Sequence, residues 1–385
     1  MSVLFVTNGH GEAAIADRIA SELRVLTPDA RIDHLALVGE GPGGAMRDVG
    51  PRRVMPSGGL VAMGNVRNLV RDVRAGLVPL TWAQLSFLRS VRGRYDAAVA
   101  VGDVYALAMT RLARAPTVFV GSAKSVNVAP YGPVEERWLA RASACFVRDE
   151  ATASALRRHG LRAEVANAIV DLFKTDDDPN AARAVEGFEP ALALFPGSRQ
   201  EAYDDARFLL GLTRDLAVRR PGLGGVLSIA PGLDADRFAE DARRDGWRVR
   251  VADDDLLPFV LGSDSRDIVR AWRGTLGPLL ARVALVLGQA GTANEAAAAA
   301  GVPVVAFERE HDRTARWYRR RQRGLLGDAL EVFGGNRNDA VAGIEALLDD
   351  QHRRERMAEA GRARMGDAGG ARQIAQRIAA LLARA

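Results

Sequence analysis

The sequence has one cysteine, very little lysine and no long apolar stretch. The single cysteine, Cys145, excludes an intrachain disulfide, and its place in the apolar run 144–147 predicts a buried, unreactive thiol. No apolar run reaches the roughly 18–20 residues that a membrane-spanning helix needs, so we expect no such helix. The five histidines have no metal-ligand spacing, and the acidic runs 176–178 and 253–255 suit solvated loops. We therefore expect no bound metal.

The charge balance is basic, because 53 Lys and Arg residues face 48 Asp and Glu residues, and the net charge is +5. Only Lys124 and Lys174 are lysines. The excess favours an anionic partner. No zinc-finger spacing and no basic–aromatic alternation is present, so nucleic acid is not the expected partner. The first residues enter an apolar run directly, without the basic and apolar segments of a signal peptide, which predicts a cytoplasmic location.

A chain of 385 residues is long for one hydrophobic core and suits two domains. Short apolar runs alternate with helical segments in both halves, which predicts an α/β protein with two doubly wound, Rossmann-like parallel sheets facing each other across a cleft. The polar segment 175–190 is the expected linker. We expect an N-terminal domain at 1–177, a C-terminal domain at 178–365, and a last helix, 366–385, that packs back on the N-terminal domain. The expected strands are 3–6, 32–38, 53–55, 97–101, 117–120, 145–147, 164–166, 191–195, 225–230, 247–251, 283–287 and 302–307.

Two turns in the second half predict a phosphate-binding site. LFPGSRQE at 194–201 and GQAGTANE at 288–295 each follow an apolar run and lead into a helix-forming segment. The free N–H groups and the positive dipole end at the start of a helix attract an anion. Two such turns in one domain suit the two anionic groups of a nucleotide diphosphate.

The motifs of the chain, taken in order, resemble those of glycosyltransferases with two Rossmann-like domains (the GT-B type). The resemblance is greatest to lipid-A-disaccharide synthase and its relatives, and more distant to the N-acetylglucosaminyl transferase of peptidoglycan synthesis. It departs from the synthase at VGSAKS, 120–125, where a Trp-rich segment is expected. The matching segments are GHGE at 9–12, VGD at 101–103, FPGSRQE at 195–201, GQAGTANEAAAAAGVPVV at 288–305 and TARWYRRR at 314–321.

The resemblance implies transfer of a sugar from a UDP-sugar to a hydroxyl of a lipid-linked or amphiphilic acceptor, with no metal or other cofactor. The donor should lie mainly on the C-terminal domain and the acceptor on the N-terminal domain. Glu295 matches an acidic residue that binds the ribose hydroxyls, and Arg199 offers a charge-assisted contact to phosphate. The remaining donor-binding candidates are Gly197, Ser198, Gln289, Gly291, Thr292 and Asn294.

Two residues of the N-terminal half are candidates for the base that takes the acceptor's proton. Asp103 ends the run 97–101, where it also suits the N-cap of the next helix. His10 is the alternative, since its ordinary pKa is near neutrality. Asn8, Gly9, Gly11 and Glu12 surround it and are the expected acceptor-side binding residues. Residues 9–14 also fit the dinucleotide pattern G-x-G-x-x-A, but Glu12 would place a negative charge at the pyrophosphate.

The segment 60–94 combines apolar residues with six arginines and one acid, Asp72. Such a segment suits the interface of an anionic bilayer, which predicts peripheral binding at the inner face of the cell membrane. Two amphipathic helices packed on the core are the other interpretation. Three hypotheses follow: a glycosyltransferase, a UDP-sugar 2-epimerase on the same scaffold, and a non-catalytic nucleotide-sugar-binding protein. We favour the glycosyltransferase.

Overall fold

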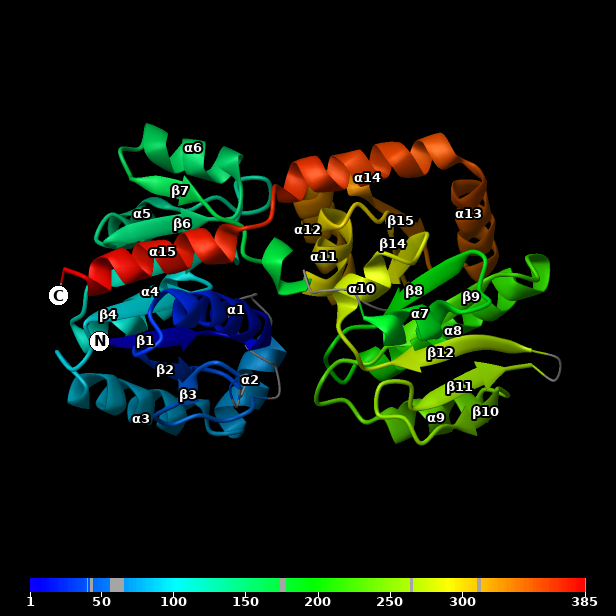
Figure 1. Ribbon diagram of the computed structural model, residues 1–385, viewed down its shortest axis with the longest axis horizontal. Helices are drawn as coiled ribbons and strands as arrows, with labels where there is room; N and C mark the ends of the chain where they lie inside the picture. Colours follow the sequence, from blue (N-terminus) through cyan, green and yellow to red (C-terminus); the bar gives the residue numbers. More distant parts are fainter. Residues whose placement is uncertain are drawn as a thin grey trace. The chain divides into compact units, whose positions relative to one another are not determined.

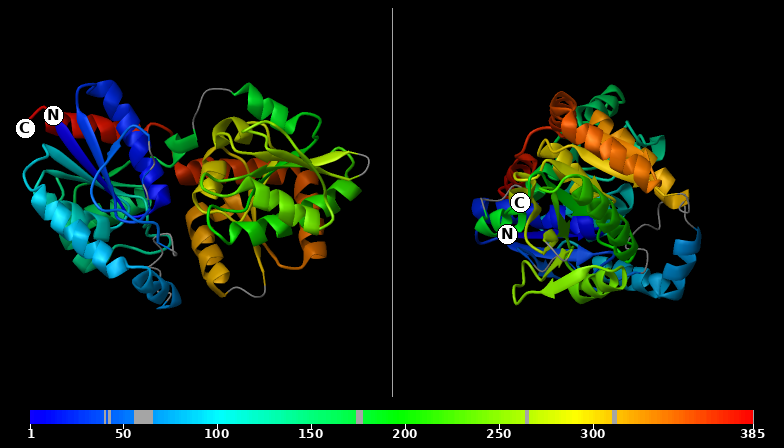
Figure 2. Two further views of the ribbon diagram at one scale, coloured as in Figure 1. Left: turned by 90° about the horizontal axis from the view of Figure 1, so that it is seen from below. Right: turned by 90° about the vertical axis from the view of Figure 1, so that its right-hand side faces the viewer.

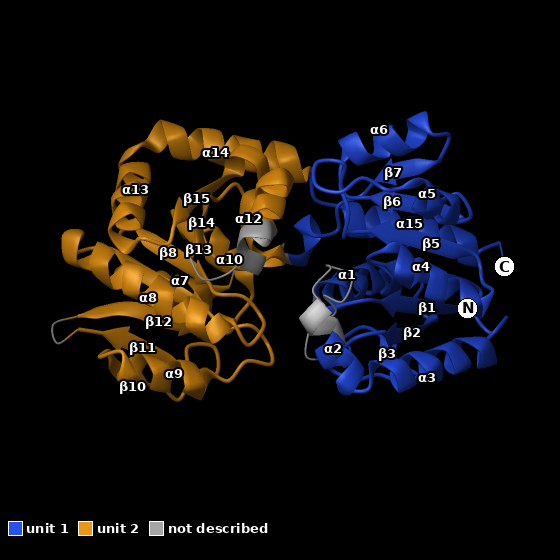
Figure 3. Ribbon diagram, turned by 180° about the vertical axis from the view of Figure 1, so that it is seen from behind, with its two compact units in different colours: residues 1–172, 367–385 blue, residues 173–366 orange. Residues whose placement is uncertain are grey.

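The computed structural model describes residues 1–39, 41, 44–55, 66–173, 178–263, 266–309 and 313–384, with the backbone alone at 10, 66–69, 173 and 313–318. It divides into two compact units (Figure 3). Unit 1 contains residues 1–172 and 367–385, and unit 2 contains residues 173–366. The last helix thus belongs to the same unit as the N-terminus. Each unit is an α/β fold with its own sheet, as the sequence predicts for the fold class.

The described part of unit 1 has a seven-stranded parallel sheet in the order β3-β2-β1-β4-β5-β6-β7. The chain runs outward from β1 through β2 to β3, then returns to β4 on the other side of β1. The carboxyl ends of β1 and β4 therefore meet where the strand order reverses. The strands are β1 Ser2–Thr7, β2 Arg31–Ala36, β3 Arg47–Asp48, β4 Ala97–Val101, β5 Thr117–Gly121, β6 Ala144–Val147 and β7 Ala163–Val165. The α-helices are α1 His10–Leu26, α2 Val66–Arg74, α3 Leu77–Ser90, α4 Val104–Thr110, α5 Pro133–Leu139, α6 Glu150–Arg158 and α15 Gly370–Leu382.

Helix α15 packs beside α1 on unit 1, so the two ends of the chain lie close together (Figures 1 and 2). Its start is held by Asp171, whose two carboxylate oxygens accept the backbone N–H of Gly369 at 2.6 Å and of Ala371 at 2.8 Å. A Cβ at Gly370 would lie 2.8 Å from the backbone nitrogen of Asn167, so only glycine permits this approach. The inward face of α15 buries Ile374, Ala375, Ile378 and Leu382.

The described part of unit 2 has an eight-stranded sheet in the order β10-β11-β12-β9-β8-β13-β14-β15. Strand β11 is antiparallel to β10 and β12, and the other pairs are parallel. The strand order reverses between β8 and β13. The strands are β8 Ala191–Phe195, β9 Gly224–Ser228, β10 Arg248–Val251, β11 Phe259–Gly262, β12 Asp267–Trp272, β13 Leu285–Gly288, β14 Val304–Glu308 and β15 Leu330–Gly334. The α-helices are α7 Pro179–Val185, α8 Ala202–Arg219, α9 Ala235–Arg244, α10 Leu276–Leu280, α11 Thr292–Ala299, α12 Arg313–Leu326, α13 Arg337–Asp349 and α14 Gln351–Met365.

The predicted strand at 53–55 is wrong. Arg53 makes only an isolated bridge to Gly39, and its guanidinium donates to the carbonyl of Ala75 at 3.0 Å. The flanking Pro51 and Pro56 lack the N–H that a ladder requires. Residues 47–48 form the short edge strand β3 instead.

The predicted linker 175–190 is also corrected, because α7 occupies Pro179–Val185. Asp178 caps this helix by accepting the N–H of Asn180 at 2.9 Å, and Ala181 and Ala184 bury its inner face. Residues 174–177 lie outside the described residues. Strands β11, β12 and β15 are not among the predicted ones, and the antiparallel edge of the sheet departs from the parallel arrangement expected.

Candidate functional site

The two predicted phosphate-binding turns lie side by side in unit 2. Strands β8 and β13 are neighbours, with Gly288 opposite Phe195, and the turns continue from their carboxyl ends. The carbonyl of Phe195 accepts the N–H of Gln289 at 2.8 Å and of Ala290 at 3.2 Å, which ties the second turn to the first strand. Open α/β sheets bind ligands where the strand order reverses, at the carboxyl ends of the strands. Both turns occupy this place.

The first turn has the open geometry of an anion-binding loop. Gly197 has a φ of +115°, and an added Cβ would meet no atom within 4 Å, so glycine is favoured by conformation rather than by crowding. Ser198 and Arg199 are exposed. The neighbouring Gln200 accepts from Arg237 at 3.1 Å. Helix α8 begins at Ala202, directly after the turn.

The second turn is fixed by close packing. Helix α11 begins at Thr292 with Gly291 as its N-cap. The buried Asn294 donates to the carbonyl of Gly288 at 3.1 Å, and a Cβ at Gly288 would lie 1.9 Å from the Asn294 Oδ1 atom. A side chain at position 288 would therefore have to displace the buried amide of Asn294. Glu295 lies in the first turn of α11 and is 8% exposed.

The side chain of Gln289 has a structural partner. Its amide donates to the carbonyl of Phe307 and accepts the N–H of the same residue, both at 3.3 Å. It therefore joins the end of β13 to β14. Because both ends of the side-chain amide are bonded to Phe307, Gln289 could contact a ligand at this turn only through its backbone.

The N-terminal candidates gather at the point where the strand order of unit 1 reverses. Asn8, after β1, donates to the Oδ2 atom of Asp103, after β4, at 3.0 Å. The other carboxylate oxygen of Asp103 caps α4 by accepting the N–H of Ala106 at 3.0 Å. The side chain of Glu12 lies against Gly102, whose φ is +126°. The structure thus brings Asn8, Glu12 and Asp103 together within unit 1.

His10 is the first residue of α1, and Gly9 is the N-cap of this helix. Gly11 is the second residue of the same helix. The side chain of His10, the alternative base, lies outside the described residues.

Four polar residues that the sequence did not single out for this site follow β5 and β6. Lys124 and Glu135 form an ion pair at 2.7 Å, and the buried Arg148 donates to the carbonyl of Ser122 at 3.1 Å. The hydroxyl of Tyr131 is buried and has no hydrogen-bond partner among the described residues. Burial raises the pKa of Tyr131 well above its ordinary value, and the charges of Cys145, Glu135 and Asp103 add to the rise. The only sequence signal for these residues is that their segment follows a buried strand.

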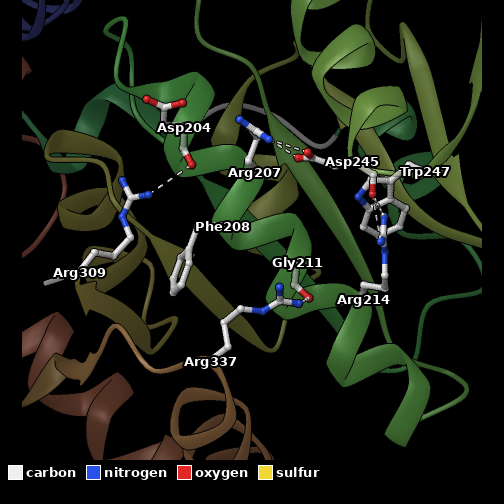
Figure 4. A pocket seen from close by; sticks show the side chains of 9 residues that line it. All are labelled: Asp204, Arg207, Phe208, Gly211, Arg214, Asp245, Trp247, Arg309 and Arg337. Carbon is white, nitrogen blue, oxygen red and sulfur yellow. Dashed lines mark hydrogen bonds and ion pairs between the residues drawn. The ribbon is translucent and has the colours of Figure 1, made fainter. Parts of the chain in front are cut away.

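A pocket of about 860 Å³ lies on the outer face of α8 in unit 2 (Figure 4). Its arginines are engaged with neighbouring groups. Arg207 makes a bidentate pair with Asp245, Arg337 pairs with Asp215 at 2.6 Å, and Arg309 pairs with Asp205. Arg214 stacks on the Trp247 ring at 4.0 Å and donates to the carbonyl of Asp245. Because these arginines are already paired, and because the two predicted phosphate-binding turns lie elsewhere, at the carboxyl ends of β8 and β13, we assign this pocket to the packing of α8 against its neighbours.

The thiol of Cys145 is buried, as expected, and burial raises its pKa to about 12. Within the described residues, no helix combines the length and the apolar character that crossing a bilayer requires.

Comparison with known proteins identifies the fold class. No family model and no curated protein matches the sequence. Among solved structures, MnaA of S. aureus with UDP matches with a TM-score of 0.62 and 15% identity, over 98% of this chain and 96% of that one. The UDP-GlcNAc 2-epimerase of Neisseria meningitidis bound to UDP-GlcNAc matches with 0.59 and 14%, over 98% and 99%. MurG of Acinetobacter baumannii matches with 0.56 and 13%, over 100% and 99%. The chain has the GT-B fold.

Proposed function

We propose that this protein is a UDP-sugar-dependent glycosyltransferase that acts on a lipid-linked or amphiphilic sugar acceptor, like the lipid-A-disaccharide synthases that its motifs resemble. One observation carries the proposal. Two strand–turn–helix units lie side by side at the carboxyl ends of β8 and β13, where the strand order reverses. MnaA of S. aureus with UDP and the Neisseria meningitidis epimerase bound to UDP-GlcNAc are two of the similar structures, and their ligands support a uridine nucleotide as the ligand here.

In this proposal the donor binds unit 2. The diphosphate contacts the backbone of Gly197 and Ser198, the guanidinium of Arg199, and the start of α11 at Gly291 and Thr292. Asn294 holds the start of α11 against β13, and Glu295 binds the ribose hydroxyls. Gln289 fixes the beginning of this turn by joining it to Phe307 of β14. Arg199 and the helix dipole oppose the charge of the leaving UDP, so the reaction needs no metal. Loss of turnover on EDTA treatment, restored by Mg²⁺, would contradict this part.

Unit 1 binds the acceptor in this proposal. Asp103 takes the proton from the acceptor hydroxyl, with His10 as the alternative base. The bond from Asn8 orients the carboxylate of Asp103. Gly9 and Gly11 allow close approach of the substrate, and Glu12 binds another acceptor hydroxyl.

The donor assignment is tested by titrating UDP into the protein in a calorimeter. Arg199→Ala should weaken binding by roughly 1.5–3 kcal/mol, the range for hydrogen bonds to charged groups. Arg243→Ala, which removes another exposed arginine of unit 2, is the matched control and should leave affinity unchanged. Equal affinities of wild type and Arg199→Ala would refute the role of this residue.

A UDP-sugar 2-epimerase is the second candidate. An epimerase needs acids around the sugar C2 position, and Asp103 and Glu12 supply two carboxylates at the carboxyl ends of β4 and β1. The likeness to a UDP-GlcNAc 2-epimerase points the same way. Incubation with UDP-GlcNAc alone separates the two, since an epimerase forms a second UDP-sugar without any acceptor. UDP binding with no turnover under either condition would favour the third hypothesis, a non-catalytic binding protein.

An amphiphilic acceptor is supported by an exposed surface of unit 1, which we call the α2–α3 surface. Val70 and Val73 of α2 and Val78 and Trp82 of α3 are exposed by 42%, 45%, 51% and 60%. Arg71, Arg74 and Arg89 are exposed on the same helices, whereas the only acid, Asp72, is buried. We propose that this surface contacts an anionic membrane from the cytoplasmic side. The part of the predicted segment at 60–65 lies outside the described residues.

A further inference from the structure

Two buried side chains of helix α12 donate hydrogen bonds to the second predicted phosphate-binding turn, 288–295. Arg319 and Gln322 are 3% and 2% exposed and lie one helical turn apart. Arg319 Nη2 donates to the carbonyl of Gln289 at 3.1 Å, and Gln322 Nε2 donates to the carbonyl of Ala290 at 2.6 Å. Arg319 Nη1 also donates to Gln322 Oε1 at 2.6 Å, so the two side chains fix each other.

These bonds set the direction of the peptide N–H groups. In a trans peptide the C=O and the following N–H point in opposite directions. The carbonyl of Gln289 faces Arg319, and the N–H of Ala290 accordingly reaches across to Phe195 at 3.2 Å. By the same geometry, the carbonyl of Ala290 faces Gln322, so the N–H of Gly291 points away from α12.

The N–H groups that follow are available to a ligand. Within the described residues, the backbone N–H groups of Gly291, Thr292 and Ala293 donate no hydrogen bond. They open the eight-residue helix α11, whose dipole places positive charge at the same point. The buried guanidinium of Arg319 adds a full positive charge behind the turn.

We infer that Arg319 and Gln322 are positioning residues, which lock the Ala290–Gly291 peptide so that these free N–H groups converge on the diphosphate of the nucleotide-sugar. The inference rests on the proposed function. The two side chains of α12 act on the turn and do not contact the ligand themselves. A bond network of this kind is formed before the ligand arrives, so it lowers the cost of ordering the turn on binding.

The test compares UDP with uridine, which lacks the phosphate groups, in binding titrations of the full chain. Arg319→Met and Gln322→Met should each weaken UDP binding roughly ten- to hundredfold and leave uridine binding unchanged. Arg319→Lys keeps the charge but cannot reach both the Gln289 carbonyl and Gln322, so it should resemble Arg319→Met. Arg320→Met, at the adjacent exposed position of α12, is the matched control and should bind UDP as wild type does.

The outcomes separate this inference from the proposed function. Wild type that fails to bind UDP overturns both. Wild type that binds UDP, with variants that bind it equally well, overturns the positioning role alone. Variants that lose UDP and uridine to the same extent reveal a merely structural role and overturn it too. If Arg319→Met does not fold, the same titrations on Gln322→Met, which removes no charge, and on the conservative Arg319→Lys test the positioning role.

Discussion

Asp103 combines two roles that a single substitution separates. Its carboxylate caps α4 and accepts from Asn8, and we propose that it is also the catalytic base. Asparagine is as good an N-cap as aspartate but is not a base. Asp103→Asn should therefore lower turnover by about 10²–10⁴-fold, the usual effect of losing a general base, with UDP affinity and stability nearly unchanged.

The matched control for this experiment is Asp149→Asn. Asp149 caps α6 in the same way, accepting the N–H of Thr152 at 2.8 Å, and is assigned no catalytic role. Normal turnover in Asp103→Asn together with an inactive His10→Ala would transfer the base role to His10. Normal turnover in both variants would show that the acceptor is activated elsewhere.

His34 is a buried group whose titration should affect stability. It is fully buried between Thr7, at 2.9 Å from Nε2, and Asp48, at 2.9 Å from Nδ1. Burial, with the nearby charge of Arg52, lowers its pKa to about 4, although Asp17 acts in the opposite direction. Below about pH 6.5 this histidine is protonated in the unfolded chain, whereas in the folded chain it stays neutral down to about pH 4. The free energy of unfolding should therefore fall as the pH falls through this window, by on the order of 3 kcal/mol.

Urea unfolding of wild type and His34→Gln at several pH values between 7 and 4 measures this effect. Other carboxylates titrate in the same range in both proteins, so the difference between the two curves isolates His34. The difference should shrink or reverse toward pH 4, where wild type has lost its advantage. Curves that stay parallel throughout would contradict the assignment.

Among the site residues, those set by local chemistry could be predicted and those set by distant contacts could not. Gly197, Gly291 and Asp103 follow buried strands directly, and this position alone placed them at the sheet edge. Gln289 was expected among the donor-binding residues, and the bond of its side-chain amide to Phe307, 18 residues away, could not be read from the sequence. Arg319 acts on Gln289 from 30 residues away, and no spacing rule connects the two.

At the scale of elements, the attachment of α15 depends on Asp171. This carboxylate is 5% exposed and accepts two backbone N–H groups at the start of the helix. Asp171→Ala leaves both donors without that partner and should reduce the free energy of unfolding by roughly 2 kcal/mol. Asp234→Ala is the control, since this exposed residue caps α9 through one bond at 2.9 Å and should cost less than about 1 kcal/mol. Equal losses in the two variants would show that Asp171 is only an ordinary cap.

The elements that the sequence predicted best are the strands buried on both faces. Strands β4 and β8 are continuous apolar runs with every residue buried, and both match their predicted bounds. Strand β10, in contrast, exposes three of its four residues, and its pairing with β11 is antiparallel. Apolar content indicates burial, but it does not give the direction in which a strand runs.

At the scale of the whole molecule, alternation of strands and helices was enough to predict two Rossmann-like sheets. The sequence placed the boundaries at 177/178 and 365/366, whereas the compact units meet at 172/173 and 366/367. The fold alone does not select a substrate, because similar structures include both MurG and a UDP-GlcNAc 2-epimerase. The choice between a glycosyltransferase and an epimerase depends on the side chains of the site and on whether the protein binds a membrane surface.

Binding to lipid vesicles tests the α2–α3 surface. An anionic bilayer should attract its arginines and bury its apolar side chains, so we expect the protein to sediment with phosphatidylglycerol-containing vesicles and less with neutral ones. Trp82 and Val78 are 60% and 51% exposed one helical turn apart on α3. Replacing both by glutamine should reduce vesicle affinity by about tenfold, since each forfeits part of the 1.5–3 kcal/mol available from burying a large apolar side chain.

The control for vesicle binding removes two other exposed valines, Val218 and Val251 of unit 2, which are 78% and 59% exposed. Glutamine at these positions should leave binding unchanged, because they lie outside the α2–α3 surface. Added salt should weaken the wild-type interaction by screening the arginines, while the apolar contribution remains. If the Val78/Trp82 variant binds anionic vesicles as wild type does, these helices do not contact the membrane. The case for a lipid-linked acceptor would then lose its structural support, and a soluble UDP-sugar substrate, as in an epimerase, would become the better explanation of the fold.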